Sequence, residues 1–195
     1  GLEPCPSCRA GDYNLCENFT RGILEPGIVQ GFNASLGGGM AEMTAALPRQ
    51  LVKVPEHVDD ETAVMADAVA SALQPVLNNF PEDGESVVVY GAGVIGQFII
   101  RCLRGLGSKA RIFAVARYGF QRDLALAGGA DEVLMSPNRR TLGEAVGASF
   151  LPTTLGGGNL EGGADAFFDC VASTRTIQDG LLALRGGGRY VMVGT

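Results

Sequence analysis

The sequence predicts an α/β protein with a doubly wound parallel sheet, preceded by an incomplete β-rich N-terminal domain that includes a cysteine-rich lobe. Strand-length apolar runs alternate with helical periodicity from Val87 onward, and a glycine turn joins the first run to the first helix. Three of the five cysteines lie in the first sixteen residues. The 195 residues are 46% hydrophobic and 18% charged, which suits a packed core and excludes a disordered chain.

Charge and composition narrow the class of partner. A net charge of -6 without clustered Lys or Arg argues against nucleic acid and anionic membranes. No apolar run reaches the roughly 18 to 20 residues of a membrane span, and no signal peptide is evident. An odd number of cysteines, with three close together, favours metal or free thiols in a reducing compartment. We therefore expect a cytoplasmic protein with a small-molecule partner.

The N-terminal part is expected to be irregular. Residues 1–20 are rich in Cys, Gly, Pro and Asn and predict a loop, while short apolar stretches between Phe32 and Pro55 predict a small β region. Acidic residues 59–61 precede an Ala-rich helix over 62–79, which Pro75 must perturb. We expect residues 1–67 to end one domain, with the lobe at 1–20, and residues 68–195 to form a second domain.

The second domain follows a regular alternation. Strands are predicted at 87–90, 111–115 and 131–135, with helices over 97–107 and 120–130 between them. Strands at 164–171 and 189–194 follow, joined by a helix within 173–188 that glycines end. Residues 138–163 are too irregular to assign. Because a six-stranded sheet of this type would lack its last strand at Thr195, we interpret the sequence as a fragment of a longer protein.

A dinucleotide-binding pattern stands between the first strand and its helix. Gly91, Gly93 and Gly96 form G-x-G-x-x-G, enclosing Val94 and Ile95. The first glycine permits a tight turn, the second lets the backbone approach a diphosphate, and the third lets the helix pack close to the strand. The helix N-terminus would face the diphosphate. The alternative is a glycine turn in an ordinary α/β sheet.

The end of the second strand predicts which dinucleotide binds. An NAD site places an acid about 20 residues beyond the glycines, but Ala116 occupies that place and Arg117 follows it. Arg117, helped by Arg122, could pair with the 2′-phosphate of NADP. The alternative is that Arg117 is a solvated surface charge. We also count Val171, at the end of the fourth strand, among the cofactor-binding residues.

The cysteines of the lobe have metal-ligand spacing. Cys5-x2-Cys8-x7-Cys16 offers three thiolates that can converge on tetrahedral Zn²⁺ in a segment with little core of its own. The alternative is three buried or incidental thiols.

The segment C-P-S-C-R-A-G-D-Y-N-L-C-E-N resembles the structural-zinc lobe of the medium-chain, zinc-dependent alcohol dehydrogenase family. The blocks GGGMAEM, GAGVIG, GGADEV, and FFDCV followed by GGGRYVMVG also match that family in order and spacing. Family members carry four cysteines, usually as C-x2-C-x2-C-x7-C, and the first would fall at Leu2. The fourth ligand then comes from upstream, or the site is incomplete.

The resemblance also implies a catalytic zinc, whose third ligand is a Cys, Glu or Asp about two dozen residues before the glycine turn. Counting back from Gly91 reaches Asp67, which we take as that ligand and catalytic residue; the alternative is a helix cap. The Cys and His that complete this site in the family are absent from the sequence. His57, the sole histidine, has no ligand role in the family and is expected to be exposed.

The implied function is a zinc-dependent oxidoreductase that transfers a hydride between an alcohol or carbonyl substrate and NADP, or NAD. The resemblance implies a homo-oligomer, either a dimer or a tetramer. The fragment alone should be inactive, because two zinc ligands and the substrate cleft lie outside it. The alternative is a dinucleotide-binding relative that is zinc-free and reductase-like, or non-catalytic.

Overall fold

The computed structural model describes residues 3–18, 21, 25, 35, 37–44, 46, 48, 51–152, 154 and 158–194. The chain divides into two compact units, Gly1–Glu56 and His57–Thr195. Residues 57–67, which the sequence assigned to the first domain, belong by their contacts to the second unit.

The first unit begins with a small cysteine-bearing lobe. Helix α1 (Pro6–Ala10) starts at Cys5, whose sulfur accepts the N–H of Cys8, and it ends at Gly11 with φ +92°. A 3-10 turn, η1 (Tyr13–Leu15), follows and leads to Cys16. The loop predicted over residues 1–20 is therefore interrupted by two short helical segments. The β region predicted within 32–55 is not formed by residues 37–44 or 51–55, and the rest of that stretch lies largely outside the described residues.

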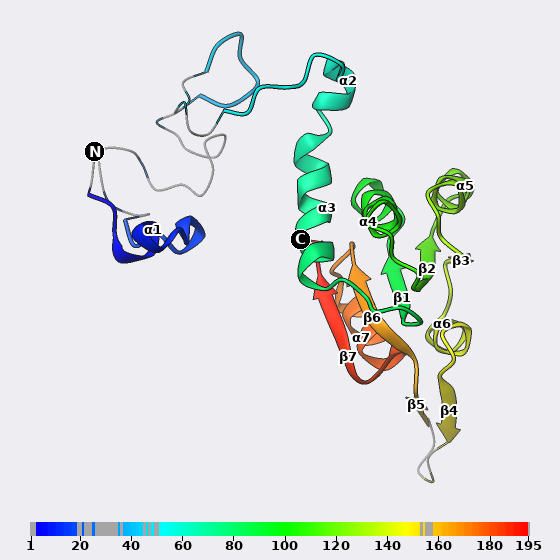
Figure 1. The fold of residues 1–195 in the computed structure, drawn as a ribbon. Helices are drawn as coiled ribbons and strands as arrows, with labels where there is room; N and C mark the ends of the chain where they lie inside the picture. The colour runs from blue at the N-terminus through cyan, green and yellow to red at the C-terminus, as the bar shows by residue number, and fades with distance from the viewer. Residues whose placement is uncertain are drawn as a thin grey trace. The chain divides into compact units, whose positions relative to one another are not determined.

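The second unit is built on a parallel sheet (Figure 1). Its strands are β1 (Ser86–Tyr90), β2 (Arg111–Ala116), β3 (Glu132–Met135), β6 (Ala164–Asp169) and β7 (Leu184–Met192), in the order β3-β2-β1-β6-β7. Val88 of the central strand is level with Phe113 on one side and Phe167 on the other. This order is that of the first five strands of a doubly wound sheet, so the predicted fold class is confirmed.

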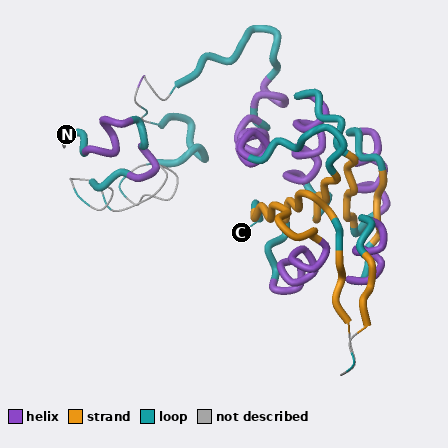
Figure 2. Tube along the Cα trace, turned by 60° about the horizontal axis from the view of Figure 1, so that its bottom comes forward, coloured by secondary structure: helices purple, strands orange, loops and turns teal. Residues whose placement is uncertain are grey.

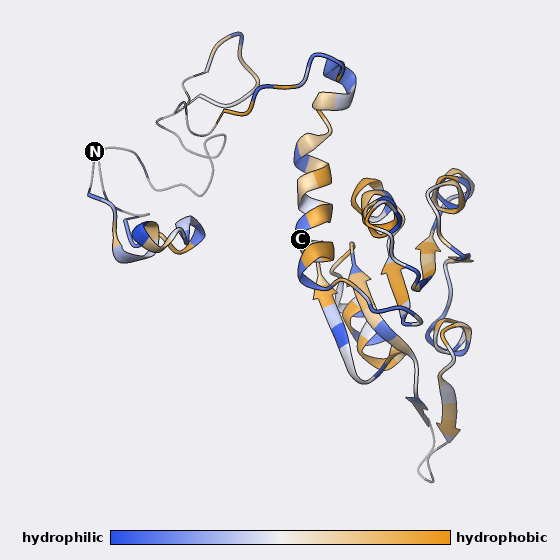
Figure 3. Ribbon diagram, in the orientation of Figure 1, coloured by the Kyte–Doolittle hydropathy of each residue, from blue (hydrophilic) through white to orange (hydrophobic). Residues whose placement is uncertain are grey.

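Helices cover both faces of this sheet. Val87 and Val89 point to the face packed by α3 (Ala66–Asn78), α4 (Val94–Gly105) and α5 (Gly119–Ala127). Val88 points to the opposite face, packed by α6 (Arg139–Ala145) and α7 (Thr174–Ala183). Figure 3 shows the resulting hydrophobic colouring along the central strands. A strand buried on both faces is continuously apolar, which is why these strands could be recognised from sequence.

The helix predicted over 62–79 is broken in two. Helix α2 (Asp60–Ala63) is capped by Asp59, whose Oδ1 accepts the N–H of Thr62 at 2.7 Å. Hydrogen bonds from the Thr62 hydroxyl and from this N–H lower the pKa of Asp59. The N–H groups of Ala63 and Val64 bind the carbonyls four residues back, but the N–H of Met65 binds that of Thr62, only three back, so the turn tightens before α3 begins. Pro75 lies inside α3, and its own carbonyl accepts a hydrogen bond from the Asn79 side chain.

Two more segments differ from prediction. Residues 138–163, left unassigned, contain α6 and an antiparallel hairpin, β4 (Ser149–Pro152) with β5 (Gly158–Glu161), which extends beyond the helices in Figure 2. Glycines 186–188 do not end α7, because Leu184 is already extended and begins β7. A Cβ at Gly188 would lie 3.1 Å from the carbonyl oxygen of Ala164, so this glycine serves strand packing instead.

Candidate functional site

A cavity of about 690 Å³ opens where β1, β2, β3 and β6 end. In an open parallel sheet, ligands bind in the crevice outside the carboxyl ends of the strands, at the point where the strand order reverses. Here that point lies between β1 and β6. The crevice is lined by Tyr90, Gly91, Ala92, Gly93, Val115, Ala116, Arg117, Tyr118, Gln121, Ser136, Pro137, Cys170, Val171, Arg175 and Thr176.

The three glycines of the turn have different surroundings. Gly91 has φ +97°, and a Cβ there would lie 2.6 Å from a methyl of Val171. A Cβ at Gly96 would overlap the carbonyl oxygen of Gly91, so only glycine lets α4 approach the turn this closely. At Gly93 no atom lies within 4 Å of an added Cβ, and this open position faces the crevice. Of the three glycines, Gly93 is therefore the one beside which there is space for a ligand.

The start of α4 supplies hydrogen-bond donors to this space. Gly93 is the N-cap and provides no side-chain cap, so the first N–H groups of the helix have no intrahelical acceptor. The N–H groups of Gly91 and Ala92 are instead bound by the Val115 carbonyl, at 3.1 and 2.9 Å, which fixes the turn to β2. The side chains of Val94 and Ile95 do not line the crevice; Ile95 packs against the core, so these residues can contribute only backbone N–H groups.

The end of β2 carries no acidic side chain at the crevice. Ala116 is buried there, and the exposed Arg117 follows it, with its guanidinium 5.5 Å from the centre of the Tyr118 ring. The Gln121 side chain accepts the N–H groups of Arg117 and Tyr118 at 3.0 and 3.2 Å, which anchors this corner.

Arg122 is placed differently from Arg117. It pairs with Asp123 at 2.9 Å and does not line the crevice. Of the cofactor-binding residues predicted from sequence, the crevice brings together Gly91, Gly93, Ala116, Arg117 and Val171. Gly96 lies behind the turn.

A buried carboxylate that the sequence analysis did not single out fixes the β6 side of the crevice. Asp169 is fully buried, and its Oδ1 accepts the N–H groups of Val171 and Ala172, both at 2.9 Å. Its Oδ2 accepts the hydroxyls of Thr176 at 2.6 Å and Tyr190 at 2.5 Å. Burial opposes ionisation of Asp169, but these hydrogen bonds outweigh it and lower its pKa. The carboxylate thus holds Val171 against the glycine turn.

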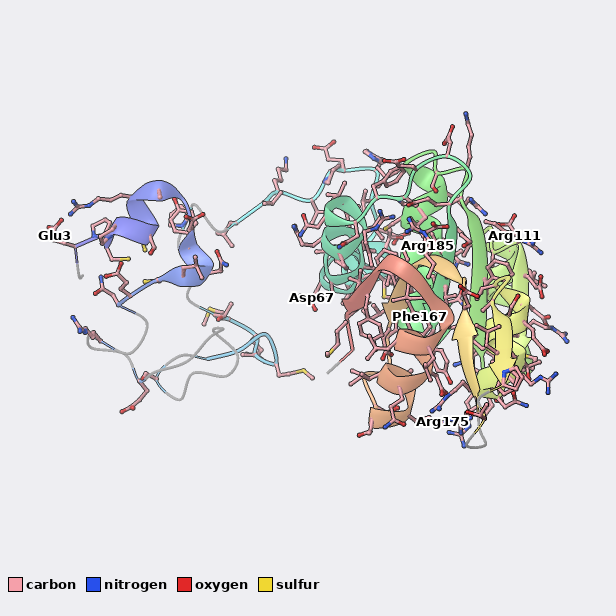
Figure 4. The ribbon with its side chains drawn as sticks, turned by 90° about the horizontal axis from the view of Figure 1, so that it is seen from below. Glu3, Asp67, Arg111, Phe167, Arg175 and Arg185 are labelled. Atoms are coloured by element: carbon pink, nitrogen blue, oxygen red, sulfur yellow. The ribbon has the colours of Figure 1, made fainter. Side chains whose placement is uncertain are left out.

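A second feature absent from the sequence analysis is an arginine on the first turn of α7. Arg175 lines the crevice and lies 3.4 Å from Asp179, whose nearly buried carboxylate also binds Arg139 of α6 at 3.0 Å. Figure 4 labels Arg175 together with Asp67. The spacing of Arg175 and Asp179 along a helix is a sequence signal for their pairing. Nothing in the sequence indicates that Arg175 reaches the crevice.

The three lobe cysteines form a cluster in the first unit. The sulfurs of Cys5, Cys8 and Cys16 all lie within 4.8 Å of one another. Backbone N–H groups of Cys8 and Glu17 donate to the Cys5 sulfur at 3.5 and 3.4 Å. These hydrogen bonds lower the pKa of Cys5 to about 7, whereas the neighbouring sulfurs raise the pKa of Cys8 to about 11. A cation would relieve the repulsion that opposes the second thiolate, so the donors fit a thiophilic metal.

Asp67 lies in the first turn of α3 and is exposed. The N-cap of α3 is Met65, and no hydrogen bond or ion pair of the Asp67 carboxylate occurs among the described residues. The side chain therefore does not act as the cap that was the alternative interpretation. Among the described residues, the cysteine triad is the cluster whose ligand atoms lie close enough together to hold a metal ion, and Asp67 is not part of it.

The strand order, the glycine turn and the crevice define an α/β domain of the Rossmann class. Residues 94–195 match the family described as zinc-binding dehydrogenase, which is just over half of the chain. The chain belongs to this family.

Named relatives agree with that assignment. The chain is 26% identical over 190 residues to L-threonine 3-dehydrogenase from Pyrococcus horikoshii, covering 97% of the chain and 48% of the relative. It is also 26% identical over 194 residues to D-xylulose reductase A from Aspergillus oryzae, covering 97% of the chain and 49% of that relative. The chain therefore spans about half the length of the curated relatives it matches.

Solved structures give the same result. An alcohol dehydrogenase from Thermus sp. ATN1 aligns with a TM-score of 0.72 and 27% identity, over 98% of this chain and 52% of that one. A zinc-binding dehydrogenase structure from Sinorhizobium meliloti 1021, bound to NADP, aligns with a TM-score of 0.71 and 26% identity, over 98% of this chain and 50% of that one. Among the described residues, no helix is both long and apolar enough to cross a membrane.

Proposed function

We propose that this chain is part of a zinc-dependent oxidoreductase that transfers a hydride between an alcohol or carbonyl substrate and a nicotinamide dinucleotide, with NADP preferred over NAD. The observation that carries the proposal is the crevice beside Gly93, where the chain leaves space for a ligand and aims the start of α4 at it. The dehydrogenases from Pyrococcus horikoshii and Thermus and the reductase from Aspergillus oryzae support the same class of reaction.

In this proposal the glycine turn holds the diphosphate. The free N–H groups at the start of α4 donate to phosphate oxygens, and the helix dipole favours their negative charge. Gly93 permits close approach because no atom of the chain occupies that space. Gly91 and Gly96 act indirectly, by letting the turn pack against Val171 and α4.

The preference for NADP rests on the corner after β2. Ala116 offers no carboxylate to the ribose hydroxyls, while Arg117 lines the crevice beside it. Charged hydrogen bonds of about 1.5 to 3 kcal/mol would favour a 2′-phosphate about 10- to 100-fold. The NADP-bound relative from Sinorhizobium meliloti supports this assignment.

Zinc and nicotinamide would supply, respectively, polarisation of the substrate oxygen and the acceptor or donor of the hydride. We propose Asp67 as the residue of this chain that ligates the catalytic zinc. Its exposed carboxylate has no other partner among the described residues, and its spacing from Gly91 supports the role. A separate, structural zinc is assigned to Cys5, Cys8 and Cys16, whose converging sulfurs fit it.

We further propose a cytoplasmic homo-oligomer, either dimeric or tetrameric. None of the five cysteines, all of which are described, forms a disulfide, which supports a reducing compartment, and the family resemblance supports self-association.

The test is NADP-linked oxidation of a panel of alcohols by the full-length protein, with Asp67→Ala as the comparison. We expect turnover in wild type, and loss of turnover but unchanged NADP affinity in Asp67→Ala, because the phosphate contacts lie at the glycine turn. NADP binding without turnover, together with zinc content that Asp67→Ala does not lower, would favour the non-catalytic alternative.

A further inference from the structure

The crevice at the carboxyl ends of the strands is lined by two cationic side chains. Arg117 follows β2, and Arg175 lies in the first turn of α7, which follows β6. No Asp or Glu is found among the described residues that line the crevice. A cleft lined by charges of one sign favours a ligand of the opposite sign, so this crevice suits a ligand with several negative charges.

The charge of Arg175 is only partly neutralised by its protein partner. Its Nε lies 3.4 Å from Oδ2 of Asp179, while Oδ1 of the same carboxylate lies 3.0 Å from Nε of Arg139. One carboxylate therefore serves two guanidinium groups. The Asp179 side chain is 4% exposed but that of Arg175 is 70% exposed, and ion pairs with so exposed a partner are weak. Arg175 can thus turn to a ligand while Asp179 keeps Arg139.

The two arginines follow the strands on either side of β1. The sheet order places β1 between β2 and β6, so the crevice is bordered by a guanidinium from each flank of the central strand. The guanidinium of Arg117 lies 5.5 Å from the centre of the Tyr118 ring and forms no ion pair with a described residue. Both side chains therefore have donors left for a ligand.

One group of NADP calls for more than one cation. A phosphate monoester carries about 1.5 to 2 negative charges at neutral pH, so a single arginine does not neutralise the 2′-phosphate. Each phosphate of the diphosphate bridge has a single charge, and in the proposed function that bridge already receives the free N–H groups at the start of α4. The 2′-phosphate is therefore the group that best matches a second guanidinium.

We propose that Arg175 is a second specificity-determining residue of the dinucleotide site, and that its guanidinium binds the 2′-phosphate of NADP together with Arg117. This inference rests on the proposed function and adds a residue to it. Asp179 is a positioning residue in this arrangement, because its buried carboxylate contacts Arg175 from α7 and Arg139 from α6.

The experiment compares the Kd of NADP with the Kd of NAD by titration calorimetry at one salt concentration, on the full-length protein and its variants. Arg175→Gln removes the charge but leaves Asp179 paired with Arg139, so the fold should persist; urea denaturation checks this. Arg175→Lys keeps the charge without the planar fork. Arg140→Gln is the matched control, because Arg140 is an exposed arginine of α6 that pairs with Glu144 at 2.7 Å and does not line the crevice.

In Arg175→Gln, the Kd for NADP should rise about 10- to 100-fold, as expected for the loss of a hydrogen bond between charged groups. The Kd for NAD should stay near the wild-type value, because NAD has no 2′-phosphate. Arg175→Lys should bind NADP with an affinity between those of wild type and Arg175→Gln. Arg140→Gln should leave both Kd values unchanged, although it changes the net charge by the same amount.

Two results would overturn the inference and leave the dinucleotide site in place. If Arg117→Ala weakens NADP binding but Arg175→Gln does not, Arg117 binds the 2′-phosphate alone and Arg175 is a surface charge paired with Asp179. If Arg175→Gln weakens NADP and NAD equally, Arg175 contacts a part that both cofactors share. A different result marks failure of the proposed function: if wild type binds neither dinucleotide, or binds NADP no more tightly than NAD, the assigned NADP preference fails and the inference fails with it.

Discussion

The carboxylate of Asp169 should couple the stability of the second unit to cofactor binding. The change that tests this is Asp169→Asn, which keeps the shape of the side chain and removes its charge. Four donors converge on the carboxylate: the N–H groups of Val171 and Ala172 and the hydroxyls of Thr176 and Tyr190. Two of these donors belong to the loop after β6, and the others belong to α7 and β7. The substitution should therefore disturb the crevice directly.

The magnitude follows from these contacts. A hydrogen bond to a charged group is worth about 1.5 to 3 kcal/mol, against about 1 kcal/mol for a neutral one, and the amide can accept only part of the set. We therefore expect the free energy of unfolding to fall by about 3 kcal/mol at neutral pH. Because Val171 lines the crevice, the Kd for NADP should rise by about tenfold, equivalent to ~1.4 kcal/mol.

The contribution of Asp169 to the free energy of unfolding should decrease at low pH. Since the pKa of Asp169 is lower in the folded protein than in the unfolded chain, its contribution is complete above about pH 4 and is lost as the pH falls through the folded value. The difference in unfolding free energy between wild type and Asp169→Asn should therefore shrink on acidification below about pH 4. Urea denaturation at several pH values measures it.

Asp165 provides a matched control on the same strand. It lies at the start of β6, where its Oδ2 accepts the N–H of Ser86 at 2.7 Å and its Oδ1 accepts Arg185 Nε at 2.5 Å. Asp165→Asn should also destabilise the fold, but the Kd for NADP should not change. If both variants weaken NADP binding equally, or if Asp169→Asn leaves it unchanged, the positioning role of Asp169 is wrong.

Two further predictions concern the turn and the corner after β2. Gly96→Ala should lower the free energy of unfolding by about 1 to 3 kcal/mol in urea titrations, because its methyl overlaps the Gly91 backbone. Gly105→Ala, by contrast, should stabilise α4 by about 0.5 to 1 kcal/mol, because no atom lies within 4 Å of its Cβ. Equal effects of the two would contradict the packing argument. Arg117→Ala should reduce the ratio of NADP to NAD affinity about 10- to 100-fold, while Arg122→Ala, paired with Asp123 outside the crevice, should leave it unchanged. An unchanged ratio in Arg117→Ala would remove that residue from the site.

The alternation of strands and helices was predictable from sequence because the central strands are buried on both faces and therefore read as apolar runs. Val87, Val88 and Val89 have no exposed surface in the structure. The glycine turn could be predicted from the sequence equally well, since its function depends on residue type and order. The hairpin in 138–163 was not, because its strands are short and exposed where they are described, and they lack the burial that produces periodicity.

The site was only partly predictable for a related reason. Residues adjacent to the turn along the chain, and Arg117 at the next strand end, follow from the topology of a parallel sheet. The role of Asp169 depends on donors that include Tyr190, which is 21 residues away, so no local pattern marks it. Arg175 reaches the crevice only because α7 starts beside it. Both features arise because segments far apart in the sequence pack against one another in the fold.

The central claim is that the crevice beside Gly93 holds the diphosphate of a dinucleotide. Titration calorimetry tests it most directly, by measuring the Kd of NADP for the full-length protein and for its Gly93→Asp variant. Gly105→Asp, which adds the same charge at the other end of α4 where no atom lies within 4 Å of the new Cβ, is the control. The account predicts that Gly93→Asp weakens NADP binding at least about 100-fold, or by ~2.7 kcal/mol, and that Gly105→Asp leaves it unchanged. Wild-type affinity in Gly93→Asp, with the fold intact by urea denaturation, would contradict it.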